Sequence, residues 1–149
     1  MSENVLRLIP TDPLYVPSVA AQDQARNLLA SLLPEGAVQI VVTEDVSFID
    51  PGDNFECILC PLCGVVVPIE WWGQMMDHTY TVSRFRDLSI IMPCCQTHSS
   101  LNDLRYEWPA GFARFLLEIH SAGIDLTEQQ LSLFEPLLGC SMRKIWAHY

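Results

Sequence analysis

The chain has 149 residues, of which half are hydrophobic and 17% are charged, and its formal net charge at pH 7 is −10. This is the composition of a globular protein rather than a disordered one, and no apolar run approaches the roughly 20 residues that a membrane helix needs. Lys and Arg total 8 against 18 Asp and Glu, so the protein's field repels phosphate backbones. We therefore expect neither nucleic acid nor a membrane as partner.

The first residues, MSENVLRLIPTDP, lack the cationic start, apolar core and cleavage site of a secretory signal. We therefore expect a cytoplasmic protein. In that compartment thiols stay reduced, and clustered cysteines bind metal or perform catalysis more often than they form disulfides. The length suits a single domain, 1–149, with a core of its own, so that a metal would reinforce the fold locally.

A helix is predicted between Ser18 and Gly36. Ser18 is a good N-cap residue, and Pro34 with Gly36 ends the pattern. Apolar residues recur at the spacing of one helical face: Ala21, Ala25, Leu28, Leu29 and Leu32.

Several shorter elements follow. The β-branched segment AVQIVVTEDVSFID (37–50) predicts one or two strands with a break at Glu44 and Asp45, and DPGDN is a turn. VVVPIE (65–70) predicts an edge strand because Pro68 cannot donate to a ladder. WWGQMMDHTYTVSRF (71–85) predicts a short helix, and DLSIIMP (87–93) predicts a strand.

The last third contains two strands and one helix. GFARFLLEIH (111–120) fits both periods, and the turn-like SAGID (121–125) that follows favours a strand. Thr127 and Gln130 form a capping box for a helix that ends at Gly139, and MRKIWAHY closes the chain as a strand. The predicted fold class is α+β, with a mainly antiparallel sheet and two or three helices.

Cys60 and Cys63 lie in the sequence CPLCG, a Cys-x2-Cys turn with a glycine directly after the second cysteine. This spacing lets both sulfurs reach one ion about 2.3 Å away, and the glycine allows the tight backbone turn. It predicts half of a zinc site.

The other half comes from MPCCQTH, which contains Cys94, Cys95 and His98. Tetrahedral zinc needs two ligands from these three. Cys94 with Cys95 would complete a site of four thiolates, whereas Cys95 with His98 matches knuckle spacing, and Cys94 with His98 is the third combination. The choice stays open at the level of sequence.

Other roles for the cysteines fit less well. The run Cys57-x2-Cys60-x2-Cys63 suggests an iron–sulfur cluster, but Val67 and Pro68 stand where the usual motif has Cys-Pro. A redox pair would need Cys60 at the start of a helix, which GVVVPIE does not predict. We expect Cys57 and Cys140 to be free thiols outside the site.

At CPLCG, PCC and SLNDLRYEWPAGFARFLLEI, the chain resembles zinc-ribbon-like small bacterial proteins of unassigned function. The segments DPGDNFE and AHY share this likeness. The resemblance implies two metal knuckles and no particular activity. The zinc-ribbon pattern has a glycine after the second pair of cysteines, where this chain has Gln96.

Function follows from whether the zinc is structural or catalytic. Four thiolates close the coordination of the ion, and the chain has no His-Glu-x-x-His motif, so we expect a structural zinc and no enzyme activity. We expect a protein that binds another protein, with the acidic charge suited to a basic partner that it neutralises or regulates. The alternatives are a metalloenzyme with an open zinc position and a zinc-ribbon accessory to nucleic acid. The segment around Trp71 and Trp72 is a candidate exposed patch.

Overall fold

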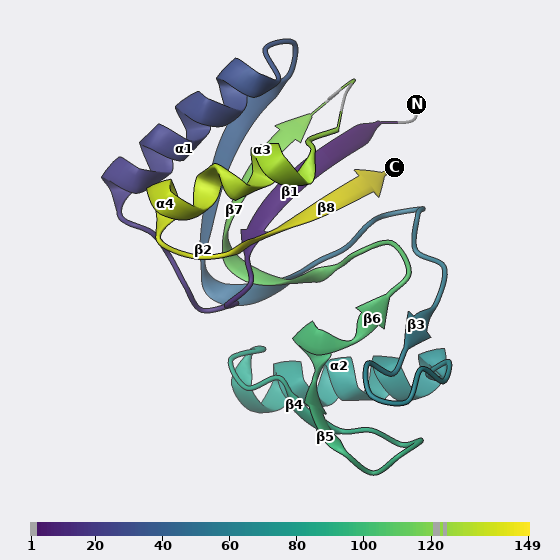
Figure 1. The fold of residues 1–149 in the computed structure, drawn as a ribbon. Coiled ribbons are helices and arrows are strands. Elements are labelled where there is room, and N and C mark those ends of the chain that lie inside the picture. The colour runs from purple at the N-terminus through teal and green to yellow at the C-terminus, as the bar shows by residue number, and fades with distance from the viewer. Residues whose placement is uncertain (1–2, 121–122, 124) are drawn as a thin grey trace.

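The computed structural model describes residues 3–120, 123 and 125–149. Its main sheet is antiparallel and has the strand order β2-β7-β1-β8 (Figure 1). The four strands are β1 (Asn4–Pro10), β2 (Ala37–Ile49), β7 (Gly111–His120) and β8 (Met142–His148). The α+β class and the mainly antiparallel sheet are therefore as predicted.

Three helices cover one face of this sheet (Figure 1): α1 (Val19–Leu32), α3 (Glu128–Ser132) and α4 (Phe134–Leu138). The side chain of Ser18 accepts a hydrogen bond from the backbone of Ala21, and Thr127 with Gln130 forms a complete capping box. Both caps are as predicted. The last predicted helix is divided into α3 and α4, and Gly139 ends α4 in the left-handed conformation.

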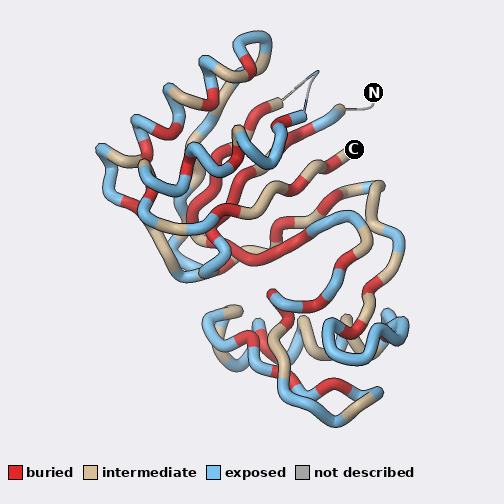
Figure 2. Tube along the Cα trace, viewed as in Figure 1, coloured by how far each residue is buried: buried red, intermediate tan, exposed pale blue. Residues whose placement is uncertain are grey.

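The buried side chains between the sheet and these helices form one apolar cluster, which includes Leu6, Leu29, Phe115, Leu117 and Phe134. Figure 2 shows the buried positions running along the central strands. The break predicted in the second segment appears as a shift in pairing between Val42 and Ser47 of β2, so the segment is one irregular strand. The predicted turn at 121–125 includes residues 121, 122 and 124, which lie outside the described residues.

A second group of elements packs below the sheet in Figure 1. It contains the 3-10 helix η1 (Leu101–Asp103), the helix α2 (Ile69–Ser83), and two short antiparallel pairs. These are β3 (Ile58–Leu59) with β6 (Arg105–Tyr106), and β4 (Ser89–Ile91) with β5 (His98–Ser100). Its buried residues form a cluster with Phe112 of β7, which joins this group to the sheet.

The predicted strand over VVVPIE is wrong. Val66 makes a single bridge to Leu59, and the chain enters α2 at Ile69. Pro68 takes the N-cap position with φ −60°, a value that its ring favours, and its missing N–H costs nothing at a helix start. Across the described residues, no helix is both long and apolar enough to cross a membrane.

Candidate metal centre

The first cysteine loop follows β3 and turns sharply between Cys60 and Gly64. The N–H of Gly64 donates to the carbonyl of Cys60, and the N–H of Cys60 donates to the carbonyl of Val65, both at 2.9 Å. Gly64 has φ +77°, a left-handed conformation that glycine adopts without a steric penalty. The turn therefore uses the glycine as the sequence predicts.

The second loop joins β4 to β5 and repeats this backbone pattern. The N–H of Gln96 donates to the carbonyl of Met92, and the N–H of Met92 donates to the carbonyl of Thr97, again at 2.9 Å. Gln96 has φ +58°, so a glutamine adopts here the left-handed conformation that Gly64 adopts in the first loop. The lack of a glycine therefore does not prevent the turn.

The shared hydrogen bonds align the two loops residue by residue. Cys60 corresponds to Met92, Leu62 to Cys94, and Cys63 to Cys95. Cys60 and Met92 are both fully buried, as equivalent positions should be. The second loop thus has methionine where the first has its leading cysteine, and its extra thiol stands two positions further on, at Cys94.

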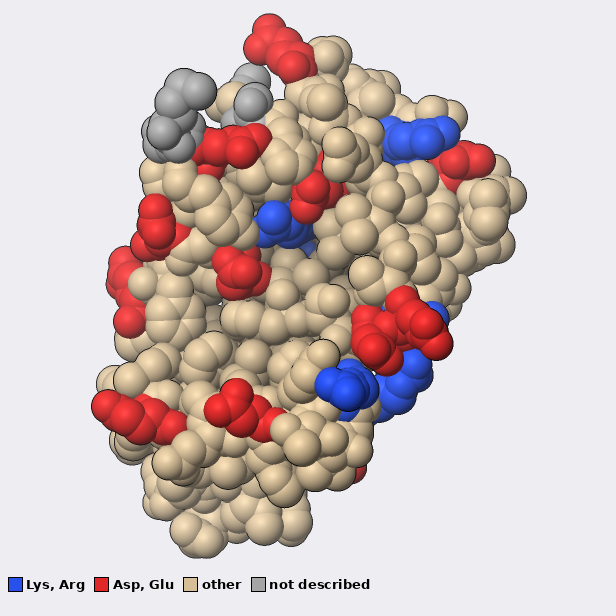
Figure 3. All heavy atoms as spheres, turned by 180° about the vertical axis from the view of Figure 1, so that it is seen from behind, with Lys and Arg blue, Asp and Glu red and all other residues tan. Residues whose placement is uncertain are grey.

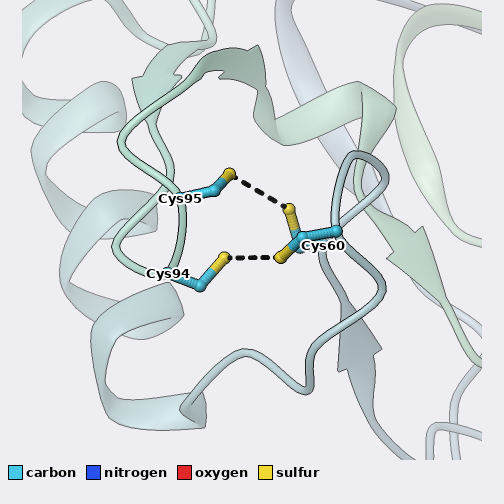
Figure 4. A group of neighbouring side chains, drawn as sticks. Cys60, Cys94 and Cys95 are labelled. Carbon is cyan, nitrogen blue, oxygen red and sulfur yellow. Dashed lines mark hydrogen bonds between the residues drawn. The ribbon is translucent and has the colours of Figure 1, made fainter.

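The two loops bring four sulfur atoms together. The Sγ atoms of Cys60, Cys63, Cys94 and Cys95 all lie within 4.8 Å of one another. In Figure 4, the side chains of Cys94 and Cys95 point across the gap toward the loop that carries Cys60. The Cys60–Cys95 sulfur distance is 3.9 Å, and the Cys63–Cys94 distance is 3.3 Å.

These distances fit one tetrahedral ion. Sulfur ligands 2.3 Å from a tetrahedral metal are about 3.8 Å from one another. Thiolates are the soft ligands that Zn²⁺, Cu⁺ and iron prefer. The four cysteines can therefore hold one metal ion between the two loops.

The thiols influence one another's ionisation. Burial raises the pKa of Cys60, but hydrogen bonds from the backbones of Cys63 and Leu62 outweigh it and lower the pKa to about 6. The hydrogen bond with Cys63, followed by burial, raises the pKa of Cys94 to about 12. Ionisation is thus favoured at Cys60 and disfavoured at Cys94, and a bound cation would favour the thiolate forms of its ligands.

Exposure differs among the four cysteines. Cys60 is buried, Cys95 is half-buried, and Cys63 and Cys94 are exposed. Cys60 belongs to the apolar cluster below the sheet, and Cys95 packs against it. An ion at this position would join the surface loops to that core.

The remaining predicted ligand, His98, lies elsewhere. It begins β5 and lines a hollow of about 620 Å³ together with Trp71, Met75, His78 and Ile91. The structure thus places Cys94 and Cys95, and not His98, beside Cys60 and Cys63. Trp71 is half-buried, as is Trp72, whose indole N–H donates to the hydroxyl of Tyr106 at 3.2 Å.

Cys57 and Cys140 lie outside the group of four. Cys140 packs against the cluster under α1, and burial raises the pKa of its thiol. The equivalence of Met92 and Cys60 was not predicted from the sequence. A signal for it exists, because CPLCG and MPCCQ align without gaps and share Pro61 and Pro93 at the second position.

Comparisons with models of protein families, with curated proteins and with solved structures found no significant match.

Proposed function

We propose that the four cysteines hold a structural zinc ion, and that the two loops act as zinc-ribbon-like knuckles. The observation that carries this proposal is the convergence of four sulfurs, all within 4.8 Å of one another, from two turns with the same backbone pattern. Four thiolate ligands are typical of closed structural zinc sites. The zinc would fix the loops against the buried cluster to which Cys60 belongs.

We propose further that the protein is not an enzyme and that it works by binding another protein. A zinc ion with four thiolates has no position for water, so it cannot generate hydroxide. A metalloenzyme would need one of the four sulfurs to stay away from the ion.

The surface around the loops supports a binding role. Five large apolar side chains there are between 47% and 60% exposed: Leu62, Val65, Val66, Ile69 and Ile91. The segments 57–69 and 88–102, which carry the loops, contain no Lys, Arg, Asp or Glu. Apolar surface without charge is typical of the centre of a protein interface.

The rest of the surface favours a basic partner. The net charge is −10, and the basic side chains visible in Figure 3 mostly lie beside acidic ones. Such a surface would attract a basic protein over long range, while the apolar loops would make the close contact. The same charge disfavours nucleic acid as the partner.

One experiment tests the metal and the binding together. The purified protein should carry close to one zinc per chain, measured by elemental analysis, and should capture a partner from a lysate of its host. Cys63→Ser should lose both the zinc and the partner, because three thiolates bind zinc more weakly and the loop then loses its anchor.

Cys57→Ser is the matched control. It removes a thiol from the same loop region but outside the group of four, so zinc and partner should both be retained. Iron with sulfide in the purified protein, or a zinc-free protein that still captures its partner, would contradict the proposal.

A further inference from the structure

A second hollow lies along the free edge of the main sheet. It has a volume of about 440 Å³ and is bounded by β8, by α3 and by the segment that precedes β7. Apolar side chains of Leu104, Pro109, Leu131 and Met142 form much of its lining. None of its lining residues is a cysteine, so it is separate from the metal centre.

Positive charge is concentrated at this hollow. Arg105, Arg143 and Lys144 all line it, which is three of the eight basic residues of a chain with 18 acidic ones. Lys144 is partly neutralised, because its ammonium group donates to Asp125 at 3.2 Å and to the carbonyl of Leu126 at 2.7 Å. Neither arginine makes a salt bridge within the described part of the chain.

Arg143 is held in place by neutral groups. Its Nη1 atom donates to the carbonyl of Ala110 at 2.9 Å, and to the carbonyl and side-chain oxygens of Asn102 at 3.1 and 3.2 Å. Arg143 is half-buried, and this burial lowers the pKa of its guanidinium, while the nearby carboxylate of Asp103 opposes the shift. Because the direct hydrogen bonds of this guanidinium are all to neutral groups, it can also bind an anion.

The strand edge adds backbone donors. Near the end of β8, the N–H of His148 points away from β1 and donates to the carbonyl of Pro51. The pairing of β8 with β1 is continuous from Met142 to His148. Because backbone groups alternate in direction along a strand, Met142 and Lys144 also turn their N–H groups away from β1, toward the hollow.

We propose that this hollow binds a small organic anion, a carboxylate or phosphate monoester carried on an apolar body. The basic residues and the N–H groups of β8 would bind the charged group, and the apolar lining would cover the body. The volume lies within the range of small-molecule sites. A long polyanion would meet the net charge of −10 around the hollow, whereas a small anion needs only the local field.

The test is a titration of the ¹⁵N-labelled full chain with benzoate and phenyl phosphate, followed by NMR. Both probes should give saturable shifts at residues 104–110 and 142–144, and the neutral benzamide should give none. Arg105→Gln should weaken binding about 1.5- to fivefold, the size expected when one exposed charge is removed. Arg105 is chosen because its side chain is exposed, whereas the bonds of Arg143 hold Asn102 and Ala110 in place.

Two further variants control for the position and for the sign of the charge that is removed. Arg26→Gln removes the same charge from α1, where Arg26 pairs with Asp23, and should leave binding unchanged. Glu128→Gln removes the one carboxylate that lines the hollow and should tighten binding. Equal weakening by Arg105→Gln and Arg26→Gln, or no saturable shifts, would overturn the site. Inorganic phosphate binding as tightly as phenyl phosphate would overturn the role of the apolar lining.

Discussion

At the scale of single residues, His120 at the end of β7 lies between two carboxylates. Its Nδ1 is 2.7 Å from Glu3, and its Nε2 is 2.6 Å from Glu118. Glu118 also accepts a hydrogen bond from Arg7 at 2.9 Å, and Arg7 donates to the hydroxyl of Tyr149. This chain of polar contacts links strands β1 and β7 with both ends of the described chain.

The two carboxylates make the stability of the protein depend on pH. Hydrogen bonds with Glu118 and Glu3 raise the pKa of His120 above its usual 6.5. The protonated ring therefore stabilises the fold fully below pH 6.5, and this contribution is lost as the pH rises through the higher pKa of the folded state. The free energy of unfolding of the wild type should exceed that of His120→Gln at pH 6, and the difference should shrink above pH 6.5.

We expect this difference to be about 0.5 kcal/mol, because the pair is partly exposed and screened by water. Urea unfolding at pH 6 and pH 9 measures it. His148→Gln is the matched control, since the ring of His148 contacts the neutral amide of Asn4. A difference between wild type and His120→Gln that grows with pH would contradict the assignment.

At the scale of elements, the two cysteine loops share the same backbone hydrogen bonds but carry their sulfur atoms at different positions. Met92 stands where the first loop has Cys60, and Cys94 stands where it has Leu62. If the loops are equivalent, a thiol at position 92 should reach the ion from the second loop as Cys60 does from the first.

A rescue experiment tests this equivalence. Cys94→Leu alone should lose most of the zinc affinity, because three thiolates remain. Adding Met92→Cys should restore it, since the second loop then has the Cys-x2-Cys spacing of the first. Zinc affinity is measured by competition with a chromophoric chelator. The smaller side chain at the buried position 92 should lower stability by about 1–2 kcal/mol.

Met75→Cys in the same Cys94→Leu background is the control. It adds a thiol on α2, a helix that packs against the same buried cluster. If it restored zinc as well as Met92→Cys does, or if neither did, the alignment of the two loops would be wrong.

The elements that the sequence predicts are those that local chemistry determines. Ser18 and the capping box at Thr127 form in the structure because each cap needs only residues within one helical turn. The same is true of CPLCG, whose turn is set by Gly64. In contrast, the three valines before Pro68 have strand propensity, but Val66 makes only a single bridge to Leu59 of β3, whose ladder partner is β6.

The parts that sequence reasoning could not predict depend on contacts between distant residues. The choice between Cys94 and His98 is decided by the direction in which the second loop leaves β4, because His98 already belongs to β5 and faces the hollow beside α2. The hollow at Arg143 likewise requires β8, α3 and the segment before β7 to meet. No short window of the sequence contains all three.

At the scale of the whole molecule, the buried side chains that lie under helices form two apolar clusters. One cluster fills the space between the main sheet and α1, α3 and α4. The other contains Cys60 and Met92 and packs under α2. The cysteine loops contribute to the second cluster only, so loss of a metal should act on that part of the molecule first.

Hydrogen exchange with and without a chelator tests whether loss of the metal acts on the second cluster first. Removing the metal should speed exchange at 57–67 and 90–101, because the loops lose their link, while the main sheet keeps its protection. We expect a 149-residue chain with its own core to fold without zinc, unlike a minimal zinc finger. The amides of β1 and of residues 115–119 in β7 act as internal controls, since the buried side chains of Leu6, Leu8, Phe115, Leu117 and Ile119 lie in the other cluster. Loss of protection throughout the sheet would show that the metal stabilises the whole fold, and unchanged exchange in the loops would show that they need no metal.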